Sequence, residues 1–369
     1  MDKPLAGLKV VELARILAGP WAGQLLADLG AEVVKVERPV TGDDTRQWGP
    51  PFAPDGASAY FHSCNRGKSS VSIDLETAQG QAQVRALAAE ADVLIENFKV
   101  GGLAKYGLDH SSLSALNPRL VTCSITGFGQ TGPYSGRAGY DFVIQAMGGA
   151  MSLTGEPDGA PQKSGIAYAD LFTGLYAAVA ILAALRERDR SGLGAHIDMA
   201  LLDSQVAVLA NQALNWMVSG DVPTRMGNGH ANLAPYQAFK AADGEIIVAV
   251  GNDRQFERLC AILELGPLAL DERFRTNPAR VANRSELIPL LAEAMAGRGR
   301  QELADALEQA GIPAGPINSV DAVFADPQVV ERGLRIEGEV PGLASPIVID
   351  GKRQVAGRPA PRLGEHGPC

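Results

Sequence analysis

One carboxylate in the chain has surroundings suited to covalent chemistry. Asp170 lies in the segment GIAYADLFTG, residues 165–174, and a strongly apolar stretch follows it directly. Such an Asp commonly caps a helix by accepting hydrogen bonds from free N–H groups. Those groups and the helix dipole would also keep the carboxylate ionised, so that it could attack an activated acyl group while the N–H groups stabilise the oxyanion. The neighbours that leave room for a ligand are all small: Gly165, Ala167, Ala169 and Gly174.

A dinucleotide site is one alternative for the first part of the chain. Glu37 ends an apparent second strand, where an acidic residue would hold a ribose hydroxyl. The loop ARILAGPWAG (14–23) argues against this site, because Pro20 and the bulky Trp21 separate its glycines and the GxGxxG spacing is missing. The loop therefore disfavours an NAD or FAD enzyme.

Motifs for metals, serine nucleophiles and triphosphates are missing as well. The five histidines lie far apart in the sequence and form no HxxxH or HExxH pair: His62, His110, His196, His230 and His366. The chain has neither the GxSxG of a serine nucleophile nor the GxxxxGKS/T of a triphosphate site. We expect no permanently bound cofactor and no metal.

Composition limits the partners and the location. The 369 residues are 46% hydrophobic and carry a net charge of −9, without a Lys/Arg run. Such a chain can bury a large and a small core, and it lacks the clustered cations that nucleic acids or anionic membranes require. The four cysteines have no CxxC spacing: Cys64, Cys123, Cys260 and Cys369. No signal core follows the N-terminus, and the apolar stretch Leu171–Leu185 is shorter than the roughly 20 residues of a bilayer span. We expect a cytoplasmic protein in which this stretch is a buried helix.

The elements that must position Asp170 follow from alternating patterns. Strand-like runs alternate with helical runs, which predicts a mostly parallel sheet with helices on both faces. The predicted strands lie at 8–13, 32–37, 69–75, 92–98, 120–129 and 196–201. Helices are predicted at 23–31 and 78–91, through the 170s up to the basic RERDR and Gly192, and from the last strand to about Gly220. The fold class is α/β, with a Rossmann-like first half.

Two domains are expected. Gly, Pro and Asn become frequent from residue 221, and strands and amphipathic helices follow up to residue 318. We assign residues 221–318 to linkers and a small α+β domain. The tail, 319–369, has too little apolar content to fold alone and returns to the large domain formed by residues 1–220.

Long segments of the chain resemble the family III CoA-transferases. The segments that carry the resemblance are LAGPWAGQLLADLGAEVVKVERP, ERPVTGDDTR, DVLIENF, TGFGQTGPY, AGYDFVIQAMGGAMSLTG, GIAYADLFTGLYAA, GNGHANLAPYQAFKAADGEIIVAVGND and PRLGEH. This family includes formyl-CoA, carnitine and succinyl-CoA:dicarboxylate transferases and a methylacyl-CoA racemase. The resemblance implies an intertwined homodimer of two interlocked rings, with CoA bound as a co-substrate on the large domain near the first βα loop.

The resemblance also implies roles for individual residues. Asp170 would be the nucleophile that takes an acyl group from the donor acyl-CoA and then carries CoA as a thioester. The CoA site would be lined by Ile16, Ala18, Arg38, Asn97, Phe98, Lys105 and Arg137. Arg and Lys would bind phosphates and Phe98 would supply an apolar face. Arg38 and Lys105 would otherwise be read as ordinary surface cations.

Departures from the family pattern separate its branches. Racemases have a His where this chain has Tyr140, and a Tyr with a pKa of about 10 is a poor base. Tyr140 would instead donate a hydrogen bond, with Asp141 orienting it or the acyl group. The formyl-CoA branch has a Gln where this chain has Leu17 and a tetraglycine segment that is missing here.

The small domain is most similar to that of transferases that use succinyl-CoA and dicarboxylates. Arg225, His230 and Asn232 are candidates to hold a distal carboxylate, or they shape a linker turn. A 2-methylacyl-CoA racemase and a non-catalytic acyl-CoA-binding protein stay open as alternatives to a transferase acting on a carboxylic acid.

Overall fold

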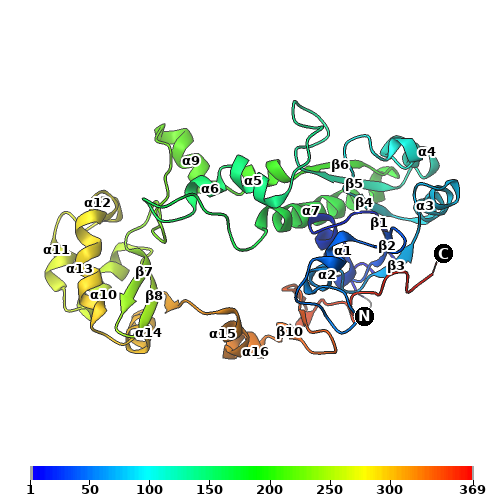
Figure 1. Ribbon diagram of the computed structural model, residues 1–369. Coiled ribbons are helices and arrows are strands. Elements are labelled where there is room, and N and C mark those ends of the chain that lie inside the picture. The colour runs from blue at the N-terminus through cyan, green and yellow to red at the C-terminus, as the bar shows by residue number, and fades with distance from the viewer. Residues whose placement is uncertain (1–2, 368–369) are drawn as a thin grey trace. The chain divides into compact units, whose positions relative to one another are not determined.

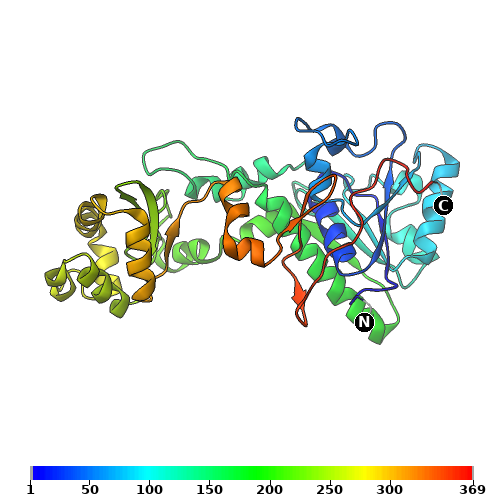
Figure 2. The ribbon, with the colours of Figure 1, turned by 90° about the horizontal axis from the view of Figure 1, so that it is seen from below.

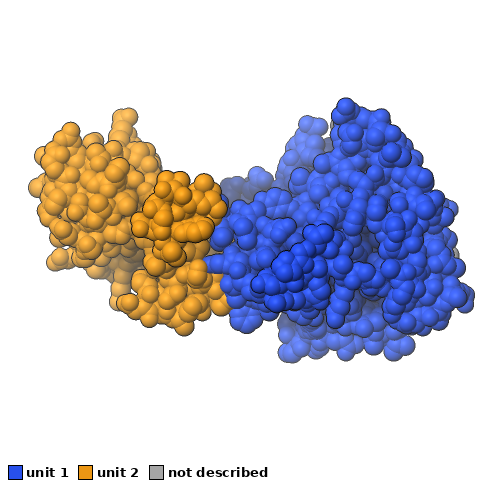
Figure 3. Space-filling view, turned by 90° about the horizontal axis from the view of Figure 1, so that it is seen from above, with its two compact units in different colours: residues 1–150, 163–210, 327–369 blue, residues 151–162, 211–326 orange. Residues whose placement is uncertain are grey.

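The computed structural model describes residues 3–367, so Cys369 lies outside the described residues. The chain forms two compact units, coloured separately in Figure 3. Unit 1 contains residues 1–150, 163–210 and 327–369, and unit 2 contains residues 151–162 and 211–326. The expected large domain had included residues 151–162, 211–220 and 319–326, which group with unit 2. Within unit 2, Gly155 O accepts a hydrogen bond from Gly227 N at 3.0 Å, which joins the first of these segments to residues far along the chain.

Unit 1 is built on a six-stranded parallel sheet, which confirms the predicted α/β class. The strand order is β3-β2-β1-β4-β5-β6. The strands are β1 (Lys9–Glu12), β2 (Glu32–Glu37), β3 (Ser69–Ser72), β4 (Val93–Glu96), β5 (Val121–Thr126) and β6 (His196–Ala200). The six predicted strands therefore all occur, and most are shorter than predicted.

The two faces of this sheet are covered by different helices. Val10 and Val11 are consecutive and point to opposite faces, as the period of a strand requires. On the Val10 side α1 (Ala18–Asp28) and α7 (Tyr168–Ser191) pack on the sheet, and Figure 2 shows these two helices side by side. On the Val11 side α3 (Ala78–Glu90) and α4 (His110–Leu116) complete a second core (Figure 1).

Shorter helices follow the strands of unit 1. They are η1 (Asp44–Gln47), α2 (Ala59–Ser63), η2 (Ala104–Tyr106), α5 (Asp141–Met147) and α8 (Leu201–Ala207). Two more helices, α6 (Ala150–Leu153) and α9 (Ala210–Ser219), begin in unit 1 and continue in unit 2. The single helix predicted to reach about Gly220 is thus broken in two. Ala210 has a φ of 45°, which interrupts the helical conformation between α8 and α9.

The first helix begins five residues before its predicted start. Pro20 lies in its first turn, where a missing N–H costs nothing, and the helix ends before Gly30, whose φ is 111°. This earlier start brings the N-terminus of α1 to the end of β1 and shortens the loop between them.

Unit 2 contains a three-stranded antiparallel sheet and a group of helices. Its strands are β7 (Tyr236–Ala241), β8 (Gly244–Ala249) and β9 (Ala314–Pro316). Its helices are α10 (Asp253–Ile262), α11 (Gly266–Leu270), α12 (Asn277–Ala282), α13 (Arg284–Ala296), α14 (Arg300–Gln309) and α15 (Val320–Ala325). Buried side chains such as Phe256, Phe274 and Leu291 fill its core.

The C-terminal segment belongs to unit 1. It contains α16 (Pro327–Glu331) and the short strands β10 (Arg335–Ile336), β11 (Gly342–Leu343), β12 (Val348–Ile349) and β13 (Lys352–Arg353). Gly67 N donates to Arg358 O at 3.0 Å, and His366 N donates to Ser70 O at 3.1 Å. These bonds join the segment to the β3 edge of the sheet, beside which Figure 1 draws it in red.

One helix among the described residues, α7, is long and apolar enough to cross a membrane, with a mean hydropathy of 1.7 over an 18-residue window. Its buried residues, among them Ala169, Thr173, Gly174 and Ala177, pack in the core of unit 1. The predicted buried helix therefore exists, but 39% of the window is buried and the other face is exposed.

Candidate active site

A cavity of about 400 Å³ in unit 1 lies beside the carboxyl ends of β1, β4 and β5. In parallel sheets this edge is the usual place for ligands. Asp170 and Tyr140 line the cavity together with six of the seven residues expected to bind CoA: Ile16, Ala18, Asn97, Phe98, Lys105 and Arg137. The fold therefore brings together residues that lie up to about 150 positions apart in the sequence.

Asp170 lies in the first turn of α7 and does not cap it. The helix begins at Tyr168, and its N-cap, Ala167, offers no side-chain acceptor. Asp141 provides the acceptor instead, because its Oδ1 receives the N–H groups of Ala169 at 2.9 Å and of Asp170 at 3.4 Å. The cap role considered for Asp170 is therefore wrong, and Asp141 performs it.

The N–H groups of this turn already have partners. Besides the two bonded to Asp141, Leu171 N donates to Ala167 O at 3.1 Å and Tyr168 N donates to Ile166 O at 2.8 Å. The expectation that these N–H groups stabilise an oxyanion is therefore not supported by this arrangement. The partners of Asp141 also differ from those expected, since its Oδ2 accepts from Gln145 Nε2 at 2.7 Å.

The electrostatic setting of Asp170 is opposite to the one expected from a helix N-terminus. Burial, and next the negative charge of Asp141, raise the pKa of Asp170 from 3.8 to about 7. Burial penalises the charged form and a neighbouring carboxylate repels it. A carboxyl group with its pKa raised towards neutrality can gain or lose its charge during a reaction.

Tyr140 precedes α5 and forms part of the cavity wall. Its side chain is 61% exposed, and its backbone carbonyl accepts from Ile144 N at 3.0 Å. The residue therefore lies where the resemblance expects a hydrogen-bond donor.

Arg38 is the expected CoA residue that lies outside this cavity. It lines an adjoining cavity of about 280 Å³, which shares Arg15, Phe98 and Tyr106 with the first. Its Nε donates to Gly42 O at 3.1 Å, and its Nη2 binds the Asp44 carboxylate. The cation therefore stands next to the main cavity.

The polar residues of the main cavity are held in different ways. Both atoms of the Asn97 amide bind the backbone of Arg15, with Oδ1 accepting from N at 2.9 Å and Nδ2 donating to O at 2.6 Å. The guanidinium of Arg137 lies 3.9 Å from the ring centroid of Tyr134. Lys105 Nζ lies 3.5 Å from Glu76 Oε1. Asn97 thus fixes the loop after β1, and the two cations flank the cavity.

Gly174 has a structural role that differs from the expected one. A Cβ atom at this position would lie 2.6 Å from Ala18 O and 3.1 Å from Trp21 Cβ. The small residue therefore lets α1 approach α7, whereas we expected it to make room for a ligand. The space around Gly165 is open to 4 Å.

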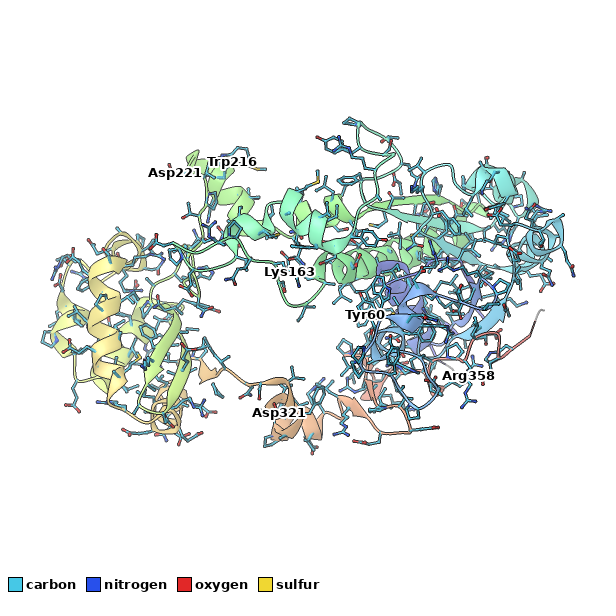
Figure 4. All side chains as sticks on the ribbon, viewed as in Figure 1. Tyr60, Lys163, Trp216, Asp221, Asp321 and Arg358 are labelled. Atoms are coloured by element: carbon cyan, nitrogen blue, oxygen red, sulfur yellow. The ribbon has the colours of Figure 1, made fainter. Side chains whose placement is uncertain are left out.

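Tyr60 is a residue of this site that sequence reasoning missed. It belongs to α2, is labelled in Figure 4, and packs edge to face on Trp48 with 5.3 Å between ring centroids. Burial, followed by the charge of Asp170, raises the pKa of Tyr60. The proximity of Tyr60 to Asp170 arises from tertiary structure, and the sequence motifs around Asp170 contain no signal for it.

Glu37 is fully engaged in unit 1 and is not placed to hold a ribose. Arg46 binds both of its oxygens, at 2.8 and 2.7 Å, and Ser70 Oγ donates to it at 2.6 Å. Within residues 3–367 no group of three or more His, Cys, Asp or Glu side chains is arranged to hold a metal ion.

The three candidates for a distal carboxylate all lie in unit 2. Arg225 donates to the carbonyls of Glu156 at 3.3 Å and Gly159 at 2.8 Å. His230 Nδ1 accepts from Asn232 N at 3.0 Å, and Asn232 Oδ1 accepts from Asn215 Nδ2 at 3.1 Å. These contacts fix local backbone, as in the alternative reading of a shaped linker turn.

Comparison with known proteins identifies the family to which this site belongs. The model of "CoA-transferase family III" matches residues 5–367. This chain belongs to CoA-transferase family III. It is therefore an enzyme of the CoA-transferase type, with CoA as a co-substrate.

Named relatives extend this assignment. The succinate–glutarate CoA-transferase of Agrobacterium fabrum is 56% identical over 98% of this chain and 94% of its own length. The human succinyl-CoA:glutarate CoA-transferase is 44% identical over 99% of this chain and 84% of its own length. A CAIB/BAIF family protein from Brucella suis has a crystal structure that matches with a TM-score of 0.89 at 58% identity, covering 99% of this chain and 98% of that one.

Proposed function

We propose that this family III CoA-transferase moves CoA from succinyl-CoA to a short dicarboxylic acid of the glutarate type. The relatives from Agrobacterium fabrum and human, at 56% and 44% identity over nearly the whole chain, carry names that specify succinate or succinyl-CoA and glutarate. The observation that supports the chemistry in this chain is Asp170, a carboxylate with a pKa of about 7 in a cavity lined by the expected CoA residues.

The proposed reaction uses Asp170 as a nucleophile. Its carboxylate attacks the succinyl carbonyl carbon and the thioester C–S bond breaks. CoA leaves as a thiolate, and Asp170 is left joined to the succinyl group as a mixed anhydride. The thiolate then attacks the aspartyl carbonyl, which releases succinate and leaves an aspartyl-CoA thioester. The acceptor carboxylate repeats these two steps in reverse order, giving its CoA thioester and free Asp170. Over the whole exchange one thioester and one carboxylate are consumed and one thioester and one carboxylate are formed, so the exchange needs no oxidant or reductant.

We propose that CoA occupies both cavities beside the β1–α1 loop. Arg38 and the residues of the smaller cavity would bind the nucleotide end, and Phe98, which both cavities share, would contact the chain between them. Lys105 and Arg137 supply cations for the phosphates. Arg225, His230 and Asn232 contribute to binding an acceptor carboxylate in this proposal.

We also propose that the enzyme is an intertwined homodimer. Helix α7 exposes an apolar stripe at the helical spacing i, i+3, i+4 and i+7, formed by Phe172 (39% exposed), Leu175 (47%), Tyr176 (43%) and Val179 (57%). Such a stripe on a helix of unit 1 is suited to burial against a second copy. Size measurements by light scattering on dilution test the dimer, and a monomer that forms on dilution would contradict interlocking.

We place this reaction in the cytoplasm. The three cysteines within residues 3–367 are free and buried: Cys64, Cys123 and Cys260. Free cysteines are typical of a reducing compartment.

The deciding experiment follows CoA between acids. The purified protein is incubated with succinyl-CoA and a panel of mono- and dicarboxylic acids in deuterated buffer, and the thioesters are analysed by mass spectrometry. We expect CoA exchange with short dicarboxylates and no deuterium at the α-carbon beyond background. Deuterium incorporation that depends on Asp170, without exchange between acids, would favour the racemase alternative. Binding of acyl-CoA with neither reaction would favour the non-catalytic one.

A further inference from the structure

Ile16 adopts a strained conformation in the wall of the cavity that contains Asp170. Its φ is 75°, in the left-handed region that β-branched residues avoid. Such strain persists only where surrounding contacts impose it. The residue follows β1 and precedes α1, so its conformation sets the direction in which the loop enters the helix.

Buried and half-buried side chains contact every polar backbone group from Ala14 O to Ile16 O. Lys35 Nζ donates to Ala14 O at 2.8 Å, and the Asn97 amide binds both N and O of Arg15. The Asp43 carboxylate receives Ile16 N at 3.3 Å on each oxygen. Cys64 Sγ lies 3.6 Å from Ile16 O. These contacts impose the conformation of Ile16 from three other segments of the chain.

The two ionic members of this set belong to a balanced network of four buried charges. Lys35 Nζ lies 3.0 Å from Glu12 Oε1 and 2.9 Å from Asp43 Oδ2, and Lys68 Nζ lies 2.8 Å from Glu12 Oε2. All four side chains have 0% exposure. Lys68 also donates to Pro20 O at 2.8 Å, so the network reaches the first turn of α1.

Stability alone does not account for such a network. Apolar residues of similar size often stabilise a core as well as a buried ion pair or better, because the pair must be removed from water. The polar atoms of this network are directed at the loop that forms the cavity wall. A role in holding that loop explains why charges occupy the interior of the sheet.

We propose that Asp43 is a positioning residue for CoA transfer, which holds Ile16 in the left-handed conformation directly and holds Ala14 through Lys35. This inference rests on the proposed function of the Asp170 cavity. Asp43 does not touch the reacting atoms in this role. It fixes the backbone of residues 14–16, against which the acyl-CoA is placed for attack by Asp170.

The test is Asp43→Asn, which keeps the size of the side chain and removes its charge. Protein incubated with succinyl-CoA is treated with hydroxylamine, which modifies Asp170 in each molecule that has formed the activated Asp170 intermediate. The transfer rate is then divided by the number of protein molecules labelled in this way, which gives kcat per labelled site. We expect kcat per labelled site to fall on the order of tenfold, since small displacements of positioning groups have effects of this size or larger, while KM for succinyl-CoA changes less. Thr45→Val, which removes a 2.8 Å hydrogen bond to Asp43 Oδ1 and leaves the charge, gives a milder variant if Asp43→Asn does not fold. We expect a smaller fall in kcat for it.

Two further variants separate positioning from general stability. Asp28→Asn breaks another buried ion pair of unit 1, with Arg66 at 2.7 Å, outside the cavity, and should lower the melting temperature with kcat unchanged. Ile16→Gly in the Asp43→Asn background should raise kcat severalfold, because Gly adopts a positive φ without strain; Ile16→Gly alone measures the effect of losing the side chain.

The outcomes separate the two proposals. If the folded Asp43→Asn or Thr45→Val protein has the wild-type kcat per labelled site, or if Ile16→Gly restores nothing, the positioning role is wrong. If the wild-type protein transfers no CoA, the proposed function fails, and the positioning role fails with it.

Discussion

Two aspartates near the cavity, Asp170 and Asp43, have opposite properties. Asp170, on α7, has another carboxylate, Asp141, beside it, and its pKa is raised to about 7 by burial and then by that charge. Burial would also raise the pKa of Asp43, but the charge of Lys35 and hydrogen bonds from Thr45 lower it below its usual value. The first carboxylate can change its charge near neutral pH, and the second keeps its charge.

The two aspartates differ in the direction in which their pKa values are shifted, and this difference suits them to different roles. Burial by itself would raise the pKa of both carboxyl groups. The nature of the nearest charged neighbour separates them: a carboxylate makes an acid reactive, and an ammonium makes it a fixed anion. The predictions below test this contrast, beginning with the largest expected effect.

Asp170→Asn should abolish transfer, because an amide cannot form the anhydride. We expect activity to fall on the order of a thousandfold or more, as when a nucleophile is removed from other enzymes. The folded structure and CoA affinity should persist, since Asp141 rather than Asp170 caps α7. Calorimetric titration with CoA checks the binding, and residual transfer above a few per cent would exclude Asp170 as the nucleophile.

Gly174→Ala should disturb the spacing between helices α1 and α7. The added Cβ would meet Ala18 O at 2.6 Å, so α1 and α7 must separate. We expect a loss of about 1–3 kcal/mol in the free energy of unfolding and a fall in kcat on the order of tenfold. Gly165→Ala is the matched control, because nothing lies within 4 Å of its added Cβ. Equal effects of the two substitutions would show that the helix spacing is unimportant.

Asp141→Asn should change the pH at which Asp170 becomes active. Without the neighbouring negative charge the pKa of Asp170 falls, so the acidic limb of the pH–rate profile, set by a pKa of about 7, should move to lower pH. The new NH₂ group can meet the NH₂ group of Gln145, which is 2.7 Å from Asp141 Oδ2, so some stability will be lost as well. The profile of kcat against pH distinguishes the two effects, and an unmoved limb would contradict the coupling.

The smallest expected effect is on stability. Because the pKa of Asp170 is raised in the folded protein, the folded state binds more protons than the unfolded state between about pH 4 and 7. The contribution of this residue to stability therefore decreases as the pH rises through that window. Wild-type protein should lose stability relative to Asp170→Asn between pH 5 and pH 8. For Asp43, whose pKa is lowered, stability is lost as the pH falls below its usual value near 4. Thermal melts at several pH values measure both trends.

The regular elements of unit 1 were predictable from sequence because their signals are local. Runs such as EVVKVE and DVLIENF alternate with helical periodicity, and they correspond to β2 and β4. The order of the strands in the sheet and the start of α1 were not predictable in the same way. The helix begins at Ala18 because its first turn packs on the end of β1, and this packing has no local signal.

The residues of the candidate site were predictable only where a sequence motif or the family resemblance pointed to them, as for Asp170 and the residues expected to bind CoA. The cap of α7 comes from Asp141, 28 residues before Ala169, so no pattern within the helix reveals it. The same holds for Tyr60, whose pKa is raised in part by the charge of Asp170, because that proximity depends on where α2 packs. The raised pKa of Asp170 was not predicted, because only the helix N-terminus was considered. The burial of Asp170 and the neighbouring carboxylate of Asp141, which raise the pKa, follow from tertiary structure.

Neighbouring residues of helix α7 lie on two faces with different surroundings. Ala169, Thr173 and Ala177 face the core, and Phe172, Tyr176 and Val179 face outwards. Each residue turns the helix by about 100°. One residue inserted after Asp170 would therefore rotate the rest of the helix by that angle and bring exposed aromatic side chains towards the sheet, although the composition would hardly change. A change of length in the first turn of α7 would thus disturb both faces of the helix at once, whereas a substitution on its exposed face changes one side chain only.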